Sequence, residues 1–416
     1  MDRLIIEGGK KLEGEVTISG AKNAALPALA CSLLTDQEVS LSNFPILGDT
    51  KFFIKILENL GVKVQLKNNE VILKADEITN TCAEYEMVRK MRASIVILGP
   101  LAARFGSVKI SLPGGCAIGK RPVDLHIMAL EKLGAKIQQK HGYIVVNAEN
   151  LKGANIHFPK VTVTGTINIL MAASIANGIT TIDNAACEPE VTFIAQMLVQ
   201  MGANIKGIGT NSLICEGVNK LSGCNMDVIP DRIESGTYIA AAAITNGNVL
   251  INNCNPAHLK AVLHKYKEIG VNLKINEDSI EVLSNGKIKG TKIETKPYPG
   301  FPTDMQAQFT ALLTVADGQS TIVENIFENR FMHTSELARM GAKIDLHGNC
   351  AIIEGRKHLS GANVMATDLR ASASLVIAAL AAQGYTEISR VYHLDRGYEN
   401  IDEKLRNLGA LIERIK

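Results

Sequence analysis

One short pattern, apolar-Gly-x-x-apolar, occurs six times at nearly constant spacing along this chain of 416 residues. Its glycines are Gly61, Gly134, Gly202, Gly270, Gly341 and Gly409, with steps of 73, 68, 68, 71 and 68 residues. A second pattern, apolar-x-Gly ahead of a short apolar segment, keeps the same period at Gly14, Gly153, Gly223, Gly290 and Gly361, with Asn80 in the remaining copy. Two markers with one period predict six copies of a single structural unit.

Each copy has the same order of predicted elements. A short strand (15–19, 155–158, 225–229, 363–366) precedes an Ala-rich helix (21–34, 91–104, 167–176, 236–245, 305–315, 371–382). In five copies this helix is predicted to end at a glycine cap, at Gly106, Gly178, Gly247, Gly318 or Gly384. A β-branched strand, an amphipathic helix and an antiparallel hairpin follow. The unit is therefore β-α-β-α-β-β, and the Ala-rich helix, apolar nearly all round, is predicted to be buried.

The two ends of the chain complete each other. The last hairpin has only one strand, 411–415, whereas residues 2–14 resemble the second hairpin strand of other copies, as in 212–223 and 350–361. Because an unpaired strand is a liability, residues 4–8 are predicted to pair with 411–415. The expected domains are 20–229 and 1–19 plus 230–416, with three repeats each. Three globules of two repeats, or an open solenoid that serves as a binding scaffold, are the alternatives.

Composition excludes several classes of function. The chain is 46% apolar and 21% charged with a net charge of +2, so no overall basic field favours nucleic acid or a membrane surface. It has no Trp and only 4% aromatic residues, which disfavours a single-strand stacking platform. Neither a signal peptide nor a membrane span is apparent. The eight cysteines show no C-x-x-C or paired Cys/His spacing, which favours a reducing cytosol and argues against zinc or disulfides.

Two features indicate an anionic substrate. The stretch 112–125, L-P-G-G-C-A-I-G-K-R-P-V-D-L, is predicted to be a loop in which nearby cations acidify Cys116. The buried helices also open on cations: Lys22, Arg92, Arg232 and Arg370. Cations at the positive end of a helix are unfavourable unless an anion is shared among them. Arg121, Arg330 and Arg396 add three more in loops. A surface turn with an incidental cysteine, and solvated turn charges, are the alternative interpretations.

Seven motifs carry a resemblance to a known family. They are S-G-A-K-N-A-A-L-P, M-R-A-S-I, P-G-G-C-A-I-G-K-R-P-V-D-L-H, G-F-P-T-D-M-Q-A-Q-F, E-N-R-F-M-H, T-D-L-R-A-S-A and D-R-G-Y-E. In order and along the whole chain they resemble the UDP-N-acetylglucosamine 1-carboxyvinyltransferases, bacterial enolpyruvyl transferases of peptidoglycan synthesis. The resemblance implies an α/β fold, the inside-out α/β barrel, with two domains of three repeats around buried helices and an active site in the cleft between them.

The resemblance also implies the reaction and its residues. The 3-hydroxyl of UDP-N-acetylglucosamine adds to C2 of phosphoenolpyruvate, C3 gains a proton, and the tetrahedral ketal loses phosphate, which requires an acid, a base and cations. Cys116 matches the family's acid, which forms a covalent phosphoenolpyruvate adduct and is alkylated by fosfomycin; Asp304 matches the base. The phosphate cations are matched by Lys22, Arg121 and Arg396, the carboxylate clamp by Arg330 and Arg370, and a further active-site cation by Arg92.

Contacts to the UDP-sugar are implied in the same way. Asn23, Asp304 and Ile326 match the amino-sugar site, and Arg121, Pro122, Val123, Asp124 and Leu125 match the segment around uracil; Arg92, Lys160, Val163 and Gly165 complete the set. The family's diphosphate turn reads K-V-S-V-G-A-T, whereas residues 160–166 read K-V-T-V-T-G-T, with the glycine moved one place to Gly165 and Thr164 in its former position. A modestly altered nucleotide affinity is expected from this departure.

The resulting expectation is a cytoplasmic, monomeric transferase with phosphoenolpyruvate and UDP-N-acetylglucosamine as substrates and with no metal, organic cofactor, nucleic acid or membrane partner. The alternatives are the enolpyruvyl transferase of the shikimate pathway, which lacks a cysteine equivalent to Cys116, and a non-catalytic UDP-sugar sensor, which needs no proton donor. An RNA-end-processing enzyme is disfavoured by the absence of a basic surface.

Overall fold

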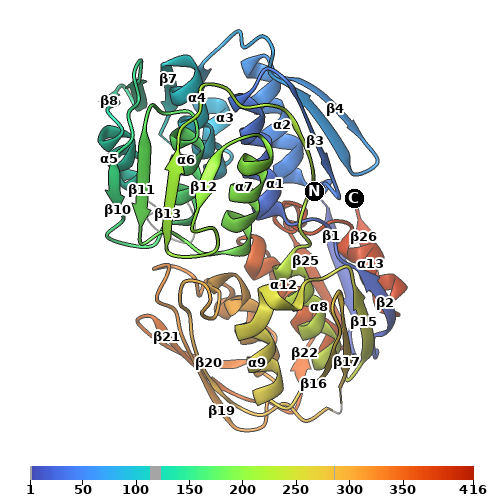
Figure 1. The fold of residues 1–416 in the computed structure, drawn as a ribbon. Coiled ribbons are helices and arrows are strands. Elements are labelled where there is room, and N and C mark those ends of the chain that lie inside the picture. Colours follow the sequence, from blue (N-terminus) through green and yellow to red (C-terminus); the bar gives the residue numbers. More distant parts are fainter. Residues whose placement is uncertain (1, 113–122, 285) are drawn as a thin grey trace. The chain divides into compact units, whose positions relative to one another are not determined.

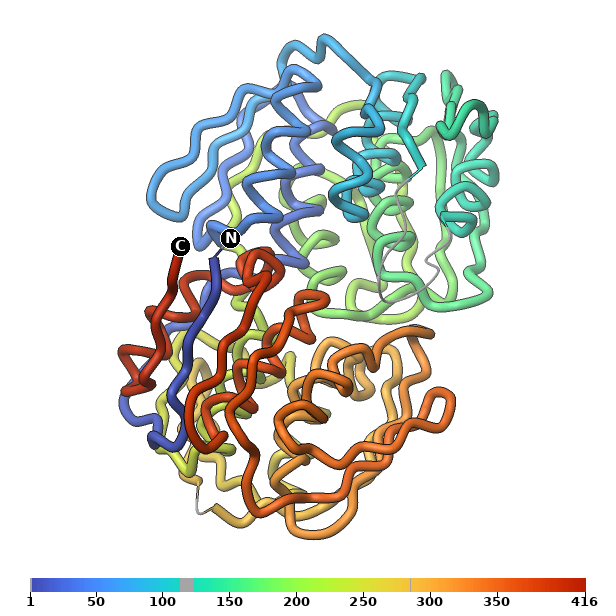
Figure 2. Tube along the Cα trace, turned by 180° about the vertical axis from the view of Figure 1, so that it is seen from behind, coloured from blue at the N-terminus to red at the C-terminus, as the bar shows by residue number. Residues whose placement is uncertain are grey.

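The structure, a computed structural model, describes residues 2–112, 123–284 and 286–416 (Figure 1). The described chain divides into two compact units. One contains residues 20–112 and 123–229 and is called the 20–229 unit; the other contains residues 2–19 and 230–416 and is called the 230–416 unit. The tube in Figure 2 follows the chain from the N-terminal strand to its C-terminal neighbour, both of which belong to the 230–416 unit.

Three four-stranded sheets form the outer layer of the 20–229 unit, and all three have the same connectivity. In each, the first two strands are parallel and the remaining neighbours antiparallel. The sheets are β14(Cys224–Asp227)-β3(Glu38–Ser42)-β5(Glu70–Lys74)-β4(Lys63–Lys67), β6(Cys82–Ala83)-β7(Ser107–Ser111)-β9(Tyr143–Asn147)-β8(Lys136–Lys140) and β10(Asn155–His157)-β11(Ile179–Asp183)-β13(Ser212–Glu216)-β12(Asn204–Lys206).

The 230–416 unit repeats this pattern three times. Its sheets are β2(Glu13–Thr17)-β15(Asn248–Asn252)-β17(Ser279–Leu283)-β16(Asn272–Ile275), β18(Lys292–Glu294)-β19(Gln319–Val323)-β21(Cys350–Glu354)-β20(Lys343–His347) and β23(Asn363–Met365)-β25(Tyr385–Ser389)-β1(Arg3–Glu7)-β26(Leu411–Ile415). A two-stranded sheet joins β22(Leu359–Ser360) to β24(Ala382–Gln383). The pairing of β1 with β26 is the one that the chain ends predicted, and it buries Leu4 and Ile6.

Buried helices fill the centre of each unit (Figure 1). They are α1(Lys22–Cys31), η2(Arg92–Ile97) with α4(Leu98–Phe105), and α6(Val163–Ala173) in one unit, and α8(Arg232–Ile244), α10(Gln306–Leu313) and α12(Leu369–Ala381) in the other. Every residue of α8 is buried, as expected for a helix without a polar face. The second helix of each repeat keeps an exposed face: α2(Gly48–Leu60), α5(Asp124–Lys132), α7(Pro189–Gln200), α9(Lys260–Glu268), α11(His333–Arg339) and α13(Ile401–Asn407).

Several predicted helix boundaries were wrong. Helices α6 and α8 each begin four residues before the predicted start, because Thr162 and Asp231 cap them and their polar openings form the first turn. Of the five predicted glycine caps, only Gly106 directly follows its helix in the left-handed conformation. Gly178, Gly318 and Gly384 have positive φ angles but lie in turns beyond the helix ends, and at Gly247 the preceding residue, Asn246, takes the positive φ instead.

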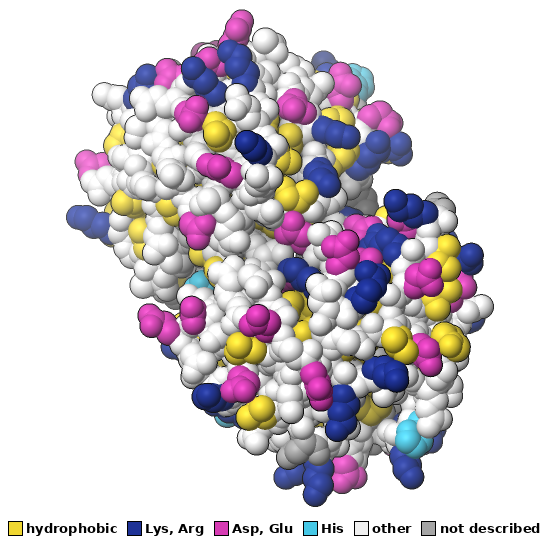
Figure 3. Space-filling view, turned by 90° about the vertical axis from the view of Figure 1, so that its right-hand side faces the viewer, with side chains coloured by type: hydrophobic (Ala, Val, Ile, Leu, Met, Phe, Trp, Pro, Cys, Tyr) yellow, Lys and Arg dark blue, Asp and Glu magenta, His cyan; other side chains and the backbone are white. Residues whose placement is uncertain are grey.

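Two strands pair outside the repeat to which their sequence assigns them. Strand β2 directly precedes α1 in the chain but pairs with β15 of the 230–416 unit, and β14 directly precedes α8 but pairs with β3 of the 20–229 unit. Strand β2 therefore completes a sheet of the 230–416 unit, and strand β14 completes a sheet of the 20–229 unit. Within the described residues no helix is both long enough and apolar enough to cross a membrane. On the face drawn in Figure 3, basic and acidic side chains are interspersed.

Candidate active site

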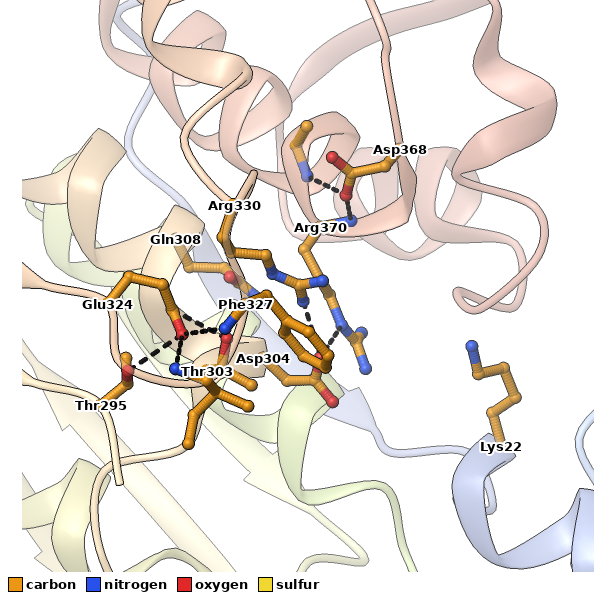
Figure 4. Close-up of polar contacts among 12 residues, drawn as sticks. Lys22, Thr295, Thr303, Asp304, Gln308, Glu324, Phe327, Arg330, Asp368 and Arg370 are labelled. Atoms are coloured by element: carbon orange, nitrogen blue, oxygen red, sulfur yellow. Dashed lines mark hydrogen bonds and ion pairs between the residues drawn. The ribbon is translucent and has the colours of Figure 1, made fainter. Parts of the chain in front are cut away.

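Asp304, Arg330 and Arg370 come together in the 230–416 unit (Figure 4). Asp304 lies in the short helix η4(Thr303–Met305), ahead of α10, and Arg370 is the second residue of α12. Nη2 of Arg330 donates to Oδ1 of Asp304 at 2.8 Å, and Nε of Arg370 lies 3.4 Å from the same oxygen. Both arginines are buried, at 6% and 4% exposure, while Asp304 is partly exposed.

The electrostatics of this cluster favour an anionic ligand. Burial, the largest single effect, would lower the pKa of Arg370, but Asp304, Tyr398 and Asp231 together outweigh burial, so the pKa of the guanidinium is raised above its ordinary value. Nε of Arg330 is buried and has no acceptor in the part of the chain that the structure describes. A buried donor without an acceptor is costly, and a carboxylate placed against the guanidinium would satisfy it.

Glu324 fixes the backbone on both sides of this cluster. It follows the last residue of β19 and is 3% exposed. Its Oε2 accepts from Oγ1 of Thr303 at 2.8 Å, and its Oε1 accepts from the backbone N–H groups of Ile326 and Phe327 at 2.8 and 3.2 Å. Oγ1 of Thr295 donates to Oε1 at 3.0 Å. One carboxylate therefore joins the turn before Asp304 to the loop that leads to Arg330 (Figure 4).

Arg396 and Tyr398 follow η5(Val391–His393) in the same unit. Arg396 is partly buried, and its charge contributes, after burial, to lowering the pKa of His393. Tyr398 is buried beside Arg370, whose Nη1 donates to the phenol oxygen at 3.3 Å. Ile326, predicted to contact the amino sugar, is 37% exposed. The 230–416 unit thus contains Asp304, Ile326, Arg330, Arg370 and Arg396 of the predicted site.

Lys22 and Asn23 open α1 of the 20–229 unit, as the cation pattern predicted. Nζ of Lys22 lies 3.4 Å from Oδ2 of Asp49, in the first turn of α2, and both side chains are largely buried. Arg92 is the first residue of η2, and Arg232 and Arg370 occupy the first and second positions of α8 and α12. The prediction that four cations stand at the starts of buried helices is confirmed.

The predicted nucleotide contacts gather where α5 and α6 begin. Val123, Asp124 and Leu125 lie at the start of α5, while Lys160 is exposed shortly before α6 and Val163 and Gly165 are in its first turn. His126 joins the two helices: its Nδ1 lies 2.9 Å from Nδ2 of Asn168 and its Nε2 lies 3.3 Å from Oγ1 of Thr164. Burial, assisted by the charge of Arg92, lowers the pKa of His126 to about 4, so this ring is neutral at pH 7.

The difference from the family's diphosphate turn at Thr164 and Gly165 does not require a residue in the left-handed backbone conformation. Neither position has a positive φ, and both belong to the first turn of α6. Thr162 caps this helix by accepting a hydrogen bond from Gly165 N at 3.2 Å. A Cβ at position 165 would lie 2.5 Å from Cγ2 of Thr162, so glycine permits this cap. Thr164 instead contacts His126, which the sequence did not predict.

Cys116, Arg121 and Pro122 lie outside the described residues. The sequence analysis gave no role to Glu324, Tyr398, Asp49, His126 or Asn168. Of these, Tyr398 and His126 had a signal: Tyr398 stands in the D-R-G-Y-E motif, and His126 is the last residue of the P-G-G-C-A-I-G-K-R-P-V-D-L-H motif. No group of three or more His, Cys, Asp or Glu side chains that could hold a metal ion occurs among the described residues.

Comparisons with known proteins identify the family. Residues 6–405 match the family model described as EPSP synthase (3-phosphoshikimate 1-carboxyvinyltransferase). Curated relatives named UDP-N-acetylglucosamine 1-carboxyvinyltransferase include those of Koribacter versatilis, 55% identical over 100% of this chain and 97% of the relative, and Desulfosudis oleivorans, 54% identical over 100% of both. A further one, from Campylobacter fetus, is 55% identical over 100% of both chains.

Solved structures share the fold at low sequence identity. The enolpyruvyl transferase NikO from Streptomyces tendae superposes with a TM-score of 0.91 at 23% identity, over 99% of this chain and 98% of that one. EPSP synthase from Acinetobacter baumannii superposes with a TM-score of 0.76 at 21% identity over the whole of both chains. The predicted fold, the inside-out α/β barrel of enolpyruvyl transferases with three repeats around buried helices in each unit, is confirmed. On the full-length match to the curated relatives, this chain belongs to the UDP-N-acetylglucosamine 1-carboxyvinyltransferases, within the wider EPSP synthase family.

Proposed function

We propose that this protein transfers the enolpyruvyl group of phosphoenolpyruvate to the 3-hydroxyl of UDP-N-acetylglucosamine and releases phosphate, the first committed step of peptidoglycan synthesis. The observation that carries the proposal is the convergence of Asp304, Arg330 and Arg370 in a chain whose full-length relatives bear this activity in their names. The function includes a role in cell-wall formation, and therefore in cell shape and division.

The arginine pair is suited to the carboxylate of phosphoenolpyruvate. A guanidinium binds a carboxylate through two parallel N–H donors, and buried guanidinium groups bind more strongly because water competes less. Arg330 supplies the buried Nε that lacks an acceptor among the described residues. Lys22, Arg121 and Arg396, with Arg92 as a further cation, are assigned to the phosphate. As phosphate leaves the ketal, these cations stabilise the charge that develops on it.

Asp304 is assigned as the general base. Its carboxylate is partly exposed and is contacted by the guanidinium groups of Arg330 and Arg370. It takes the proton of the sugar hydroxyl while the oxygen attacks C2 of phosphoenolpyruvate and C3 is protonated. Loss of a C3 proton and of phosphate from the ketal then restores the C2–C3 double bond and gives the enol ether of the sugar.

Cys116 is assigned as the acid for C3 and as the residue that fosfomycin alkylates. Burial raises the pKa of the Cys215 thiol to about 12 and those of Cys224 and Cys254 to about 11, and it also raises the pKa of Cys31. Because the thiolate is the nucleophile, these four cysteines are poor targets for an epoxide. Cys116→Ser is therefore expected to abolish covalent labelling by fosfomycin, and labelling that persists at another cysteine would refute the assignment.

The starts of α5 and α6 are assigned to the nucleotide. Backbone N–H groups at a helix N-terminus bind phosphate, and Lys160 adds a charge beside α6. The uracil segment is assigned to residues 121–125, and Asn23 and Ile326 to the amino sugar. The enzyme is proposed to be a cytoplasmic monomer that needs neither a metal nor an organic cofactor.

One assay separates the proposal from its rivals. Phosphate release from phosphoenolpyruvate is measured with UDP-N-acetylglucosamine or with shikimate 3-phosphate as the acceptor, and we expect turnover with the first only. Turnover with shikimate 3-phosphate would favour the activity for which the matching family model is named. Binding of UDP-N-acetylglucosamine without phosphate release would favour a sensor. Asp304→Asn serves as the catalytic control and is expected to lower kcat about a thousandfold.

A further inference from the structure

We propose that Tyr398 is a positioning residue, whose hydroxyl holds the guanidinium of Arg370 in the orientation that binds the carboxylate of phosphoenolpyruvate. The inference rests on the proposed function, because it assigns Arg370 to that carboxylate. Tyr398 is 2% exposed, and its phenol oxygen has three polar neighbours: Nη1 of Arg370 at 3.3 Å, Oγ1 of Thr237 at 2.9 Å and Nε2 of Gln308 at 3.3 Å.

The direction of each hydrogen bond around Tyr398 follows from the number of protons available. Thr237 donates its one hydroxyl proton to the carbonyl oxygen of Ile233 at 2.7 Å, so towards Tyr398 it acts as an acceptor. The phenol proton is therefore directed to Thr237, and the phenol oxygen accepts from Arg370 and Gln308. Gln308 Nε2 also lies 3.2 Å from Oγ1 of Thr237, which closes the network. Burial raises the pKa of Tyr398, so the phenol keeps its proton.

Arg370 is consequently held at two ends. Its Nε faces Asp304 and its Nη1 faces the phenol, with the Cζ atom 5.8 Å from the centroid of the Tyr398 ring. With only the contact to Asp304, the planar guanidinium could turn about the Cδ–Nε bond and away from the substrate carboxylate. The hydroxyl of Tyr398 removes that freedom.

The unit contains two matched tyrosines for the test. Tyr266 is fully buried and donates to the carbonyl oxygen of Gly236 at 2.7 Å, one residue from Thr237, but does not touch Arg370. Tyr238, also buried, has a hydroxyl without a hydrogen-bond partner in the described chain. Replacement of each by Phe removes one buried hydroxyl from the same core, and only Tyr398→Phe frees the guanidinium of Arg370.

The experiment measures KM and kcat for both substrates in the three Tyr→Phe variants. For Tyr398→Phe we expect the KM for phosphoenolpyruvate to rise about tenfold while the KM for UDP-N-acetylglucosamine stays within about twofold, since a hydrogen bond to a charged group is lost. Tyr266→Phe is expected to lower the melting temperature, and Tyr238→Phe is expected not to; neither should change the KM for phosphoenolpyruvate.

Thr237→Val tests the same network without altering Tyr398, and therefore covers the case in which Tyr398→Phe does not fold. It should raise the KM for phosphoenolpyruvate by a smaller factor, Thr237→Ser should restore it, and the Tyr398→Phe/Thr237→Val double variant should be less than additive. An unchanged KM in both single variants, or an equal rise in Tyr266→Phe, would overturn the positioning role. A wild-type enzyme that releases no phosphate would overturn the proposed function instead.

Discussion

At the scale of single residues, the site contains two buried arginines that do not each have a carboxylate of their own. Arg330 and Arg370 share one carboxylate, that of Asp304, although burial of a charged group is costly unless it is paired. Two guanidinium groups carry one more positive charge than their shared carboxylate balances. The excess positive charge favours the binding of a further anion. Glu324 likewise serves several partners with one carboxylate, which accepts four hydrogen bonds from neutral donors.

Glu324 gives a prediction about stability. In Glu324→Gln the side-chain oxygen can still accept from Thr295 and from the two backbone N–H groups, while the new NH2 donates to Thr303, whose hydroxyl can reverse its role. We expect a loss of about 1 kcal/mol of unfolding free energy. Glu324→Ala leaves the backbone donors without an acceptor and should cost about 3 kcal/mol. Urea denaturation measures both values, and equal losses would contradict this account of the bonding.

At the scale of elements, the start of α6 combines a helix cap, a glycine and a contact to α5. Return of the glycine to position 164 through Thr164→Gly and Gly165→Ala removes the Thr164 contact to His126 and places a Cβ against Thr162. We expect a change of about two- to tenfold in the affinity for UDP-N-acetylglucosamine, because the backbone N–H groups of this turn shift. Isothermal titration calorimetry checks the result; an unchanged affinity would remove the hypothesis. Thr181→Val, at an exposed hydrogen bond in β11, is the control.

At the scale of the whole molecule, each unit contains a buried histidine with a lowered pKa. Burial lowers the pKa of His333 to about 4, as it does that of His126, with Asp368 acting in the opposite direction and Arg330 in the same one. The unfolded chain, with a histidine pKa of about 6.5, therefore binds more protons than the folded chain between pH 6.5 and 4. Stability from these groups is present above pH 6.5 and is lost as the pH falls.

We expect each histidine to contribute up to about 3 kcal/mol to this loss between pH 7 and pH 4. His126→Gln should flatten the pH dependence of unfolding in the 20–229 unit and His333→Gln in the 230–416 unit. Hydrogen exchange at pH 7 and pH 5 measures the two units separately. His264→Gln, at an exposed position, is the control and should leave both slopes unchanged. Equal slopes in all three variants would contradict the prediction.

The sequence by itself determined the repeat, the order of elements in each copy, the pairing of the terminal strands and the cations at the starts of the buried helices. These features follow from the periodicity of apolar residues within short segments and from the need of strand β1 for a pairing partner. Only the tertiary structure decided that β2 and β14 pair outside their own repeats and that Glu324, Tyr398 and His126 support the predicted residues. Such contacts join residues far apart in the chain. A local sequence pattern cannot predict them, because it does not specify which distant atom completes a buried hydrogen bond.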